Sequence, residues 1–144
     1  MPYRYLDDIS LADAAFEVTG KTLNEVFADA AKAVTNTMVQ DLRTVDHKVE
    51  RVINLSSDSI EKLLFDFLQY LVYYKDAEKL LFSKFDVRVQ DGTIGHLKLE
   101  ARVHGEELDY DKHDLSADVK AVTMHKFQLK KIGDLWNGMV ILDI

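Results

Sequence analysis

Two aspartates and one lysine occupy strand-like segments in which charged side chains are seldom found. Asp143 stands in "MVILDI", an almost wholly apolar run, and Asp13 stands at the start of the alternating run "DAAFEVT". Lys120 lies within "ADVKAVTMH", where it is expected to share a partly buried strand face with Val122 and Met124. Because an isolated charge in a buried strand is costly, each of these side chains should have a hydrogen-bonded, cationic or metal partner.

Two arrangements would satisfy this expectation. One is a structural ion pair between Lys120 and an aspartate, or strand ends that reach water, and the residue types alone favour it because structural ion pairs resemble sites. The other is an oxygen-rich pocket formed by Asp13, Asp143 and a main-chain or terminal carboxylate oxygen of Ile144, the last residue of the sequence. Oxygen ligands without Cys or His suit Ca²⁺ or Mg²⁺.

Other kinds of chemistry find little support in the sequence. The absence of cysteine excludes disulfides, thiolate zinc sites and cysteine nucleophiles. The five histidines, at positions 47, 96, 104, 113 and 125, show no HxH or HExxH spacing, and most of them are expected at the surface or in strands. No GxSxG, Walker or GxGxxG motif occurs. A net charge of −7 argues against tight, direct nucleic-acid binding, although a locally basic patch remains compatible with it.

The hydrophobic periodicity predicts one α+β domain over residues 1–144, with two helices packed on a mostly antiparallel β-sheet. Thr22 and Glu25 have the spacing of a capping box at the start of the first helix, and Asp58 is the expected N-cap of the second. The predicted elements are a strand at 12–19, a helix at 21–38, a strand at 47–55, a helix at 58–74, a hairpin around "DGTIG", a strand at 117–132, a turn at 133–134 and a last strand at 139–144.

Targeting and membrane signals are not evident. The first residues, "MPYRYLDDIS", lack the apolar segment of a signal peptide. The longest apolar stretches fall well short of the roughly 20 residues that a membrane-spanning helix needs. The sequence therefore predicts a soluble, cytoplasmic protein.

Several long motifs in consistent order resemble the archease family. The segments "GKTLNEVFADAAKAVTNTM", "IEKLLFDFLQYLVYYKDAEKLLFSKF", "GEELDYDKHDLSADVKAVTMH" and "VILDI" together cover nearly the whole chain. The third segment contains the family patterns G-E-x-x-D-x-x-K-H and V-K-A-[IV]-T-x-H. The matching residues are Gly105, Glu106, Asp109, Lys112 and His113, followed by Val119, Lys120, Ala121, Val122, Thr123 and His125.

The resemblance implies the archease fold and an accessory protein rather than an enzyme. Archeases promote guanylylation and turnover of the tRNA-splicing RNA ligase and broaden its use of NTPs. The family's metal site maps to Asp13, Asp143 and Ile144, with Ca²⁺ favoured over Mg²⁺, and its essential lysine maps to Lys120. The implied partners are the ligase and an NTP with Mg²⁺ in the ligase's active site, without direct nucleic-acid binding and without a membrane.

Two alternatives remain beside this interpretation. A metal-dependent enzyme could use Asp13, Asp143 and Lys120 on a nucleotide, although the sequence offers no evident general base or nucleophile. A binding module or chaperone for RNA-modifying enzymes would have a purely structural pocket. The N-terminal motif also departs from the family pattern H-T-x-D: the chain has "DDISLAD", so Ser10 or Asp8 takes the place of the histidine, and Asp8 could add an oxygen ligand.

Overall fold

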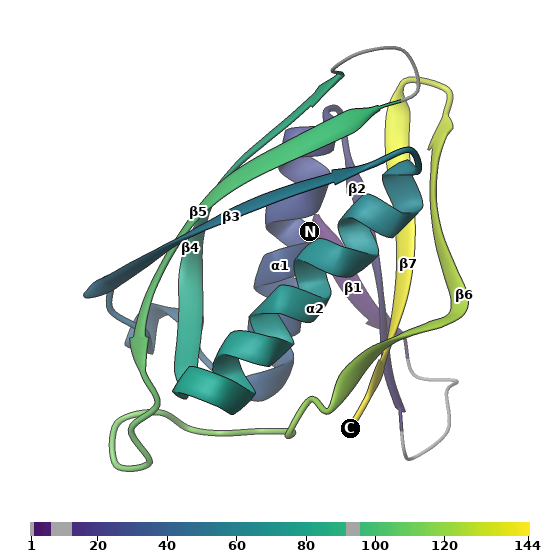
Figure 1. Cartoon of the computed structure of the whole chain (residues 1–144). Helices are drawn as coiled ribbons and strands as arrows, with labels where there is room; N and C mark the ends of the chain where they lie inside the picture. The colour runs from purple at the N-terminus through teal and green to yellow at the C-terminus, as the bar shows by residue number, and fades with distance from the viewer. Residues whose placement is uncertain (1, 7–12, 92–95) are drawn as a thin grey trace.

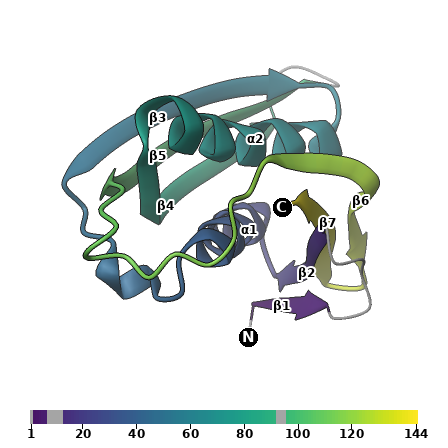
Figure 2. The ribbon, with the colours of Figure 1, turned by 90° about the horizontal axis from the view of Figure 1, so that it is seen from below.

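Two helices pack between two antiparallel sheets (Figures 1 and 2). The computed structural model describes residues 2–6, 13–91 and 96–144. The four-stranded sheet has the order β1-β2-β7-β6 and the three-stranded sheet the order β3-β5-β4. The elements are β1 (Tyr3–Leu6), β2 (Asp13–Gly20), α1 (Leu23–Met38), a 3₁₀ turn (Leu42–Thr44), β3 (Val49–Ser57), α2 (Ile60–Glu78), β4 (Leu80–Asp91), β5 (Leu97–Glu107), β6 (Ala121–Ile132) and β7 (Leu135–Asp143).

The predicted α+β class with two helices is confirmed, and the strands divide between two sheets instead of forming one. A single hydrophobic cluster joins the inner faces of both sheets to the helices. At its centre Phe27 of α1 stacks on Phe67 of α2, with ring centroids 6.2 Å apart. The predicted hairpin of β4 and β5 is also present, although its turn at residues 92–95 lies outside the described residues.

The two helices begin at residues that satisfy their first N–H groups. The Thr22 Oγ1 accepts a hydrogen bond from the backbone N–H of Glu25 at 3.2 Å, as the capping-box spacing predicts. The prediction of Asp58 as the second N-cap is wrong, because the Ser59 Oγ accepts from the N–H of Lys62 at 3.2 Å. Both residue types cap helices well, so composition alone does not distinguish two adjacent candidates.

Side chains from the helices cover the outer edges of both sheets. An edge strand leaves N–H groups without a neighbouring strand to accept them. An asparagine on α1 accepts a hydrogen bond from β4, and a glutamine and a glutamate on α2 accept hydrogen bonds from β6. The three hydrogen bonds are Val89 N–H to Asn24 Oδ1 (2.8 Å), Val122 N–H to Gln69 Oε1 (2.9 Å) and Leu129 N–H to Glu61 Oε2 (3.0 Å).

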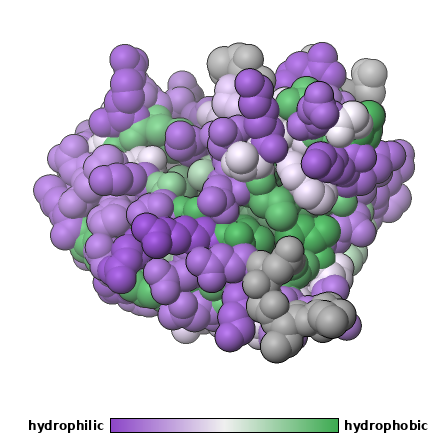
Figure 3. All heavy atoms as spheres, turned by 90° about the horizontal axis from the view of Figure 1, so that it is seen from above, coloured by the Kyte–Doolittle hydropathy of each residue, from purple (hydrophilic) through white to green (hydrophobic). Residues whose placement is uncertain are grey.

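The surface seen from above combines a mainly hydrophilic rim with an apolar area near its middle (Figure 3). Large apolar side chains are exposed elsewhere too, among them Tyr73 at 56% and Met124 at 61%. Within the part of the chain that the structure describes, neither helix has the length and hydrophobicity required to cross a bilayer.

Candidate functional site

The backbones of Asp13, Asp143 and Lys120 meet at one end of the four-stranded sheet. Asp13 of β2 lies directly opposite Asp143 of β7, and Ala121 of β6 lies opposite Asp143 on the other side. The Lys120 N–H donates to the carbonyl oxygen of Asp143 at 2.8 Å. The start of β6 and the C-terminus therefore lie side by side (Figures 1 and 2). The structure thus brings together three residues that are far apart in the sequence.

The expectation that Lys120 is partly buried is wrong. Its side chain is exposed, because β6 begins only at Ala121 and is the edge strand of its sheet. Among the residues described, Lys120 is in no ion pair, so the predicted Lys–Asp pair is not formed. An exposed ammonium group needs no protein partner, since water solvates it. The Lys120 side chain is consequently available to a ligand or partner.

The acidic end of this site has oxygen donors that fit a hard cation. Asp13 and Asp143 are both half-buried and, as directly opposed residues, project from the same face of the sheet. Carboxylates at opposed positions repel each other, and a bound cation would relieve that repulsion. No group of three or more His, Asp or Glu side chains placed to hold a metal occurs in residues 2–6, 13–91 and 96–144. The oxygen-bearing groups at this end of the sheet are the carboxylates of Asp13 and Asp143 and the main chain of Ile144.

The suggested replacements for the family's histidine, Ser10 and Asp8, lie outside the described residues. Of the N-terminal motif, Asp13 of β2 is the residue that the structure describes. Asp13 and Asp143 supply only oxygen, which matches the preference of Ca²⁺ and Mg²⁺ for carboxylates and carbonyls.

A half-buried lysine of α2 fixes the segment that leads into Lys120. The side chain of Lys75 is 12% exposed and hydrogen-bonds to the Asp118 carboxylate and, at 2.9 Å, to the carbonyl oxygen of Val119. Burial lowers the pKa of Lys75, but hydrogen bonds to Asp118 and Asp76 outweigh it and leave the pKa raised. The lysine therefore remains charged and holds the two residues that precede Lys120.

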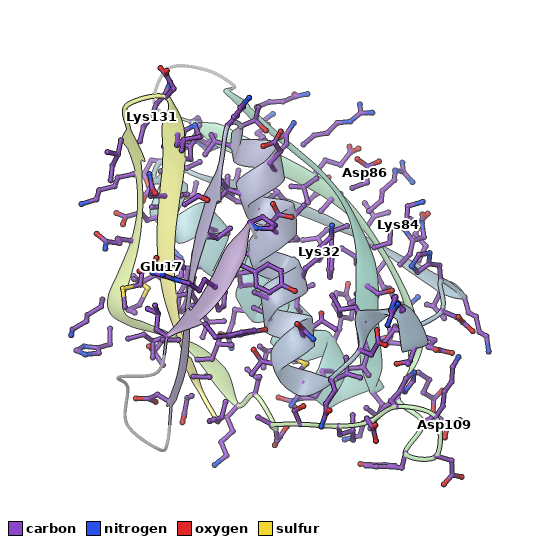
Figure 4. The ribbon with its side chains drawn as sticks, turned by 180° about the vertical axis from the view of Figure 1, so that it is seen from behind. Glu17, Lys32, Lys84, Asp86, Asp109 and Lys131 are labelled. Atoms are coloured by element: carbon purple, nitrogen blue, oxygen red, sulfur yellow. The ribbon has the colours of Figure 1, made fainter. Side chains whose placement is uncertain are left out.

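A second polar cluster, centred on the buried carboxylate of Glu106, holds the loop between β5 and β6. The Glu106 Oε2 accepts hydrogen bonds from Lys112 Nζ (2.6 Å), His113 Nε2 (3.0 Å) and the backbone N–H of Asp46 (2.8 Å). Glu106 is 5% exposed and His113 is 3% exposed. Through Lys112 and His113, these contacts hold the first turn of the loop against β5 of the three-stranded sheet. Asp109 lies at the outer end of that loop (Figure 4).

The hydrogen bonds also determine which ring nitrogen of His113 carries the proton. The Nδ1 accepts from the backbone N–H of Asp109 at 3.0 Å, so the ring proton is on Nε2, which donates to Glu106. Most histidines are expected at the surface or in strands, and His113 is an exception because it is buried in a loop. The G-E-x-x-D-x-x-K-H pattern was the signal that could have revealed this cluster, because all its charged members take part.

Comparisons with known proteins lead to one family. The model of the Archease protein family matches residues 3–144. The chain is 33% identical to the protein archease of Methanosarcina mazei over 142 residues, which cover 99% of this chain and 95% of that protein. The chain belongs to the archease family. It is also 37% identical to the archease of Methanothermobacter thermautotrophicus, over 92% of this chain and 93% of that one.

Solved structures agree with the archease assignment. The solution structure of Methanobacterium thermoautotrophicum protein 1598 superposes with a TM-score of 0.85 at 35% identity, and the match covers 99% of both chains. The crystal structure of an archease from Thermotoga maritima, described as a possible chaperone, gives a TM-score of 0.61 at 18% identity, over 94% of this chain and 93% of that one. The latter similarity shows the shared fold.

In this archease the glycine of the signature is required by close backbone packing. A Cβ atom added to Gly105 would lie 1.7 Å from the carbonyl oxygen of Leu81 on β4. The register of β4 against β5 shifts between Phe82 and Lys84, which brings the two backbones together at this point. Gly105 thereby permits the strand pairing that places Glu106 in its buried position.

The Glu106 cluster should make archease stability depend on acid pH. Burial raises the pKa of Glu106, but hydrogen bonds from Lys112, the Asp46 N–H and His113 outweigh it and lower the pKa to about 2. The charged carboxylate therefore stabilises the fold fully above its unfolded pKa of 4.5, and this stabilisation is lost as pH falls from 4.5 towards 2. Urea unfolding across this range should show a loss of about 3 kcal/mol. In Glu106→Gln the free energy of unfolding should depend less on pH across this range. An equally steep dependence would contradict the role assigned to the Glu106 carboxylate.

Proposed function

We propose that this chain activates a tRNA-splicing RNA ligase. In this role it promotes guanylylation of the ligase, supports its turnover and broadens the NTPs that the ligase accepts. Membership of the archease family supports the proposal. The observation that carries it is the junction at which the backbone of Lys120, whose side chain is exposed, bonds to the backbone of Asp143, which in turn lies opposite Asp13. A non-enzymatic role is consistent with this site, which combines the ammonium group of Lys120 with carboxylate oxygens.

Each residue of the junction has a defined task in this proposal. The Lys120 ammonium would bind oxygens of the triphosphate in the ligase's active site, because a mobile point charge suits phosphate. Asp13, Asp143 and a main-chain oxygen of Ile144 would hold a divalent cation, Ca²⁺ in preference to Mg²⁺. When bound, this cation neutralises the carboxylates and offers a positive charge to phosphate oxygens. Lys75 keeps the segment before Lys120 in place.

The proposal is tested by following ligase guanylylation with each NTP. The purified chain is incubated with NTPs alone, with ligase alone, and with both. Stimulation that requires the ligase supports the activator. NTP turnover by the chain alone would identify a metal-dependent enzyme, and the absence of both effects would leave a binding module or chaperone.

Metal analysis gives a separate prediction for the carboxylates. The wild-type protein dialysed against Ca²⁺ should retain about one ion per chain, since two carboxylates and a main-chain oxygen form one site. Asp143→Ala should lose this ion. Asp134→Ala is the matched control, because Asp134 is exposed in the turn at the other end of β7. Equal metal content in Asp143→Ala and wild type would remove Asp143 from the site.

A further inference from the structure

Four exposed lysines lie on or directly before the edge strand β6, and two of them, Lys130 and Lys131, are consecutive and so project from opposite faces of the strand. We call Lys120, Lys126, Lys130 and Lys131 the lysine stripe. The chain as a whole has a net charge of −7, yet residues 119–133 contain no aspartate or glutamate. Positive charge is therefore concentrated on one edge of the four-stranded sheet, with Lys131 at the tip of the β6–β7 hairpin (Figure 4).

The elements that face β6 add little negative charge to the stripe. β7 pairs with β6 and carries no charged residue from Leu135 to Leu142. Its carboxylate Asp143 and the turn residue Asp134 lie at the two ends of the stripe. On α2, the Glu61 carboxylate accepts the N–H of Leu129 and places one negative charge beside the middle of β6, and Asp118, which is paired with Lys75, lies near Lys120.

Other carboxylates on the adjoining elements are paired with basic residues outside the stripe. Glu17 of β2 forms an ion pair with Arg4 at 3.1 Å. Asp66 of α2 is paired with Lys62 at 3.1 Å. Within the described ranges, the lysines that form ion pairs are Lys32, Lys48, Lys62, Lys75 and Lys112. The positive charge of the lysine stripe is therefore not neutralised by these ion pairs.

An irregularity in β6 directs part of the stripe towards solvent. The register against β7 shifts between Thr123 and Gln128, so residues 124–127 form a wide bulge. Within it, Lys126 has a φ of 54°, a backbone conformation that residues other than glycine seldom adopt. Both Lys126 and His125 are exposed. Bulges re-aim side chains, and this one places two basic groups on the outer side of the strand.

We propose that the lysine stripe binds the phosphodiester backbone of a single-stranded nucleic acid. Measured along the partner strand β7, the stripe spans roughly 26 Å at about 3.3 Å per residue, a length that suits a chain of several phosphates better than a single nucleoside triphosphate. Lysine is a flexible point charge suited to phosphate, and it is depleted in protein–protein interfaces. The aromatic rings on β6 are the exposed imidazole of His125 and the half-buried ring of Phe127, so little base stacking is expected and binding should depend mainly on charge.

Binding of a nucleic acid is a property separate from the activation of a ligase. It is therefore tested without ligase and without NTP. The acidity of the whole chain keeps the binding weak, whereas the local stripe makes it sensitive to salt. Lys120 belongs both to the stripe and to the junction with Asp143, so it is left unchanged in the test. A failure of nucleic-acid binding would therefore leave the proposed activation of the ligase untouched.

Fluorescence anisotropy with labelled single-stranded RNA and DNA of about 12 nucleotides measures the binding. With four lysines engaged, the logarithm of the association constant should fall with the logarithm of the salt concentration with a slope of about −3. The affinity should therefore fall about 50-fold between about 50 and about 200 mM salt. The double variant Lys126→Gln/Lys130→Gln should bind at least about tenfold more weakly, with a slope nearer about −1.4. The matched control Lys84→Gln/Lys98→Gln removes the same charge from exposed positions of the three-stranded sheet (Figure 4).

The outcomes separate clearly. Weaker binding by the stripe variant together with wild-type binding by the control supports the proposal, whether RNA and DNA bind alike or RNA binds more tightly. Equal losses in both double variants would show only a response to total charge and would overturn it. Absence of binding by the wild type at low salt would also overturn it, and would point to an acidic protein surface as the partner of the stripe.

Discussion

Replacement of Lys120 by glutamine should reduce the stimulation of ligase guanylylation by about 10- to 100-fold, which is the effect of losing one charge-assisted hydrogen bond to a phosphate. The fold should be unaffected, because the Lys120 side chain is exposed and in no described ion pair. Its backbone hydrogen bond to Asp143 is independent of the side chain. The expected result is a protein with wild-type thermal stability and almost no activity as an activator.

Lys84→Gln provides the matched control for Lys120→Gln, since Lys84 is also exposed and lies on the other sheet (Figure 4). Guanylylation is followed by incorporation of labelled GMP into the ligase at several concentrations of the activator. A Lys120→Gln protein that stimulates at the wild-type rate would remove this side chain from the mechanism. A partial effect in Lys120→Arg would show that charge matters more than the shape of the side chain.

Replacement of Glu106 by alanine should lower the free energy of unfolding by about 3 to 5 kcal/mol, the usual cost of removing one partner of a buried charged cluster. The change leaves Lys112, His113 and the N–H of Asp46 without their shared acceptor. Since the loop leading to Lys120 would lose one of its attachments, the stimulation of the ligase should weaken as well.

Chemical denaturation and thermal melting measure the effect of the Glu106 change. For a chain of this size the melting temperature should fall by roughly 10 °C. Glu107→Ala is the control, because Glu107 is the adjacent residue but is exposed. Similar losses in the two variants would contradict the central role of the Glu106 carboxylate.

Periodicity and capping patterns predicted the helices and most strands well. Alternating apolar residues are reliable for strands with one buried face, as in β2, where Phe16 and Val18 are both buried. The division into two sheets was not predicted, because the strand pattern records which face is buried and not which neighbour a strand will have. The bulge at residues 124–127 escaped prediction for the same reason.

The candidate site was predicted in part. Asp13, Asp143 and Lys120 do lie together at the backbone level. The error at Lys120 arose because an edge position exposes a residue that would be buried in a central strand. The roles of Glu106 and His113 depend on a cluster that forms only when the loop folds back on the sheet, which residue spacing alone does not specify.

The side chains with which α2 completes the edge of β6 also have a consequence for self-association. Gln69 and Glu61 occupy N–H groups that another strand could otherwise use. If heating loosened α2 before the sheet, those groups would be open to β6 of a second molecule, and intermolecular strand pairing could begin there. The lysines on β6 would then act as gatekeepers, since two copies aligned along this edge would bring like charges together.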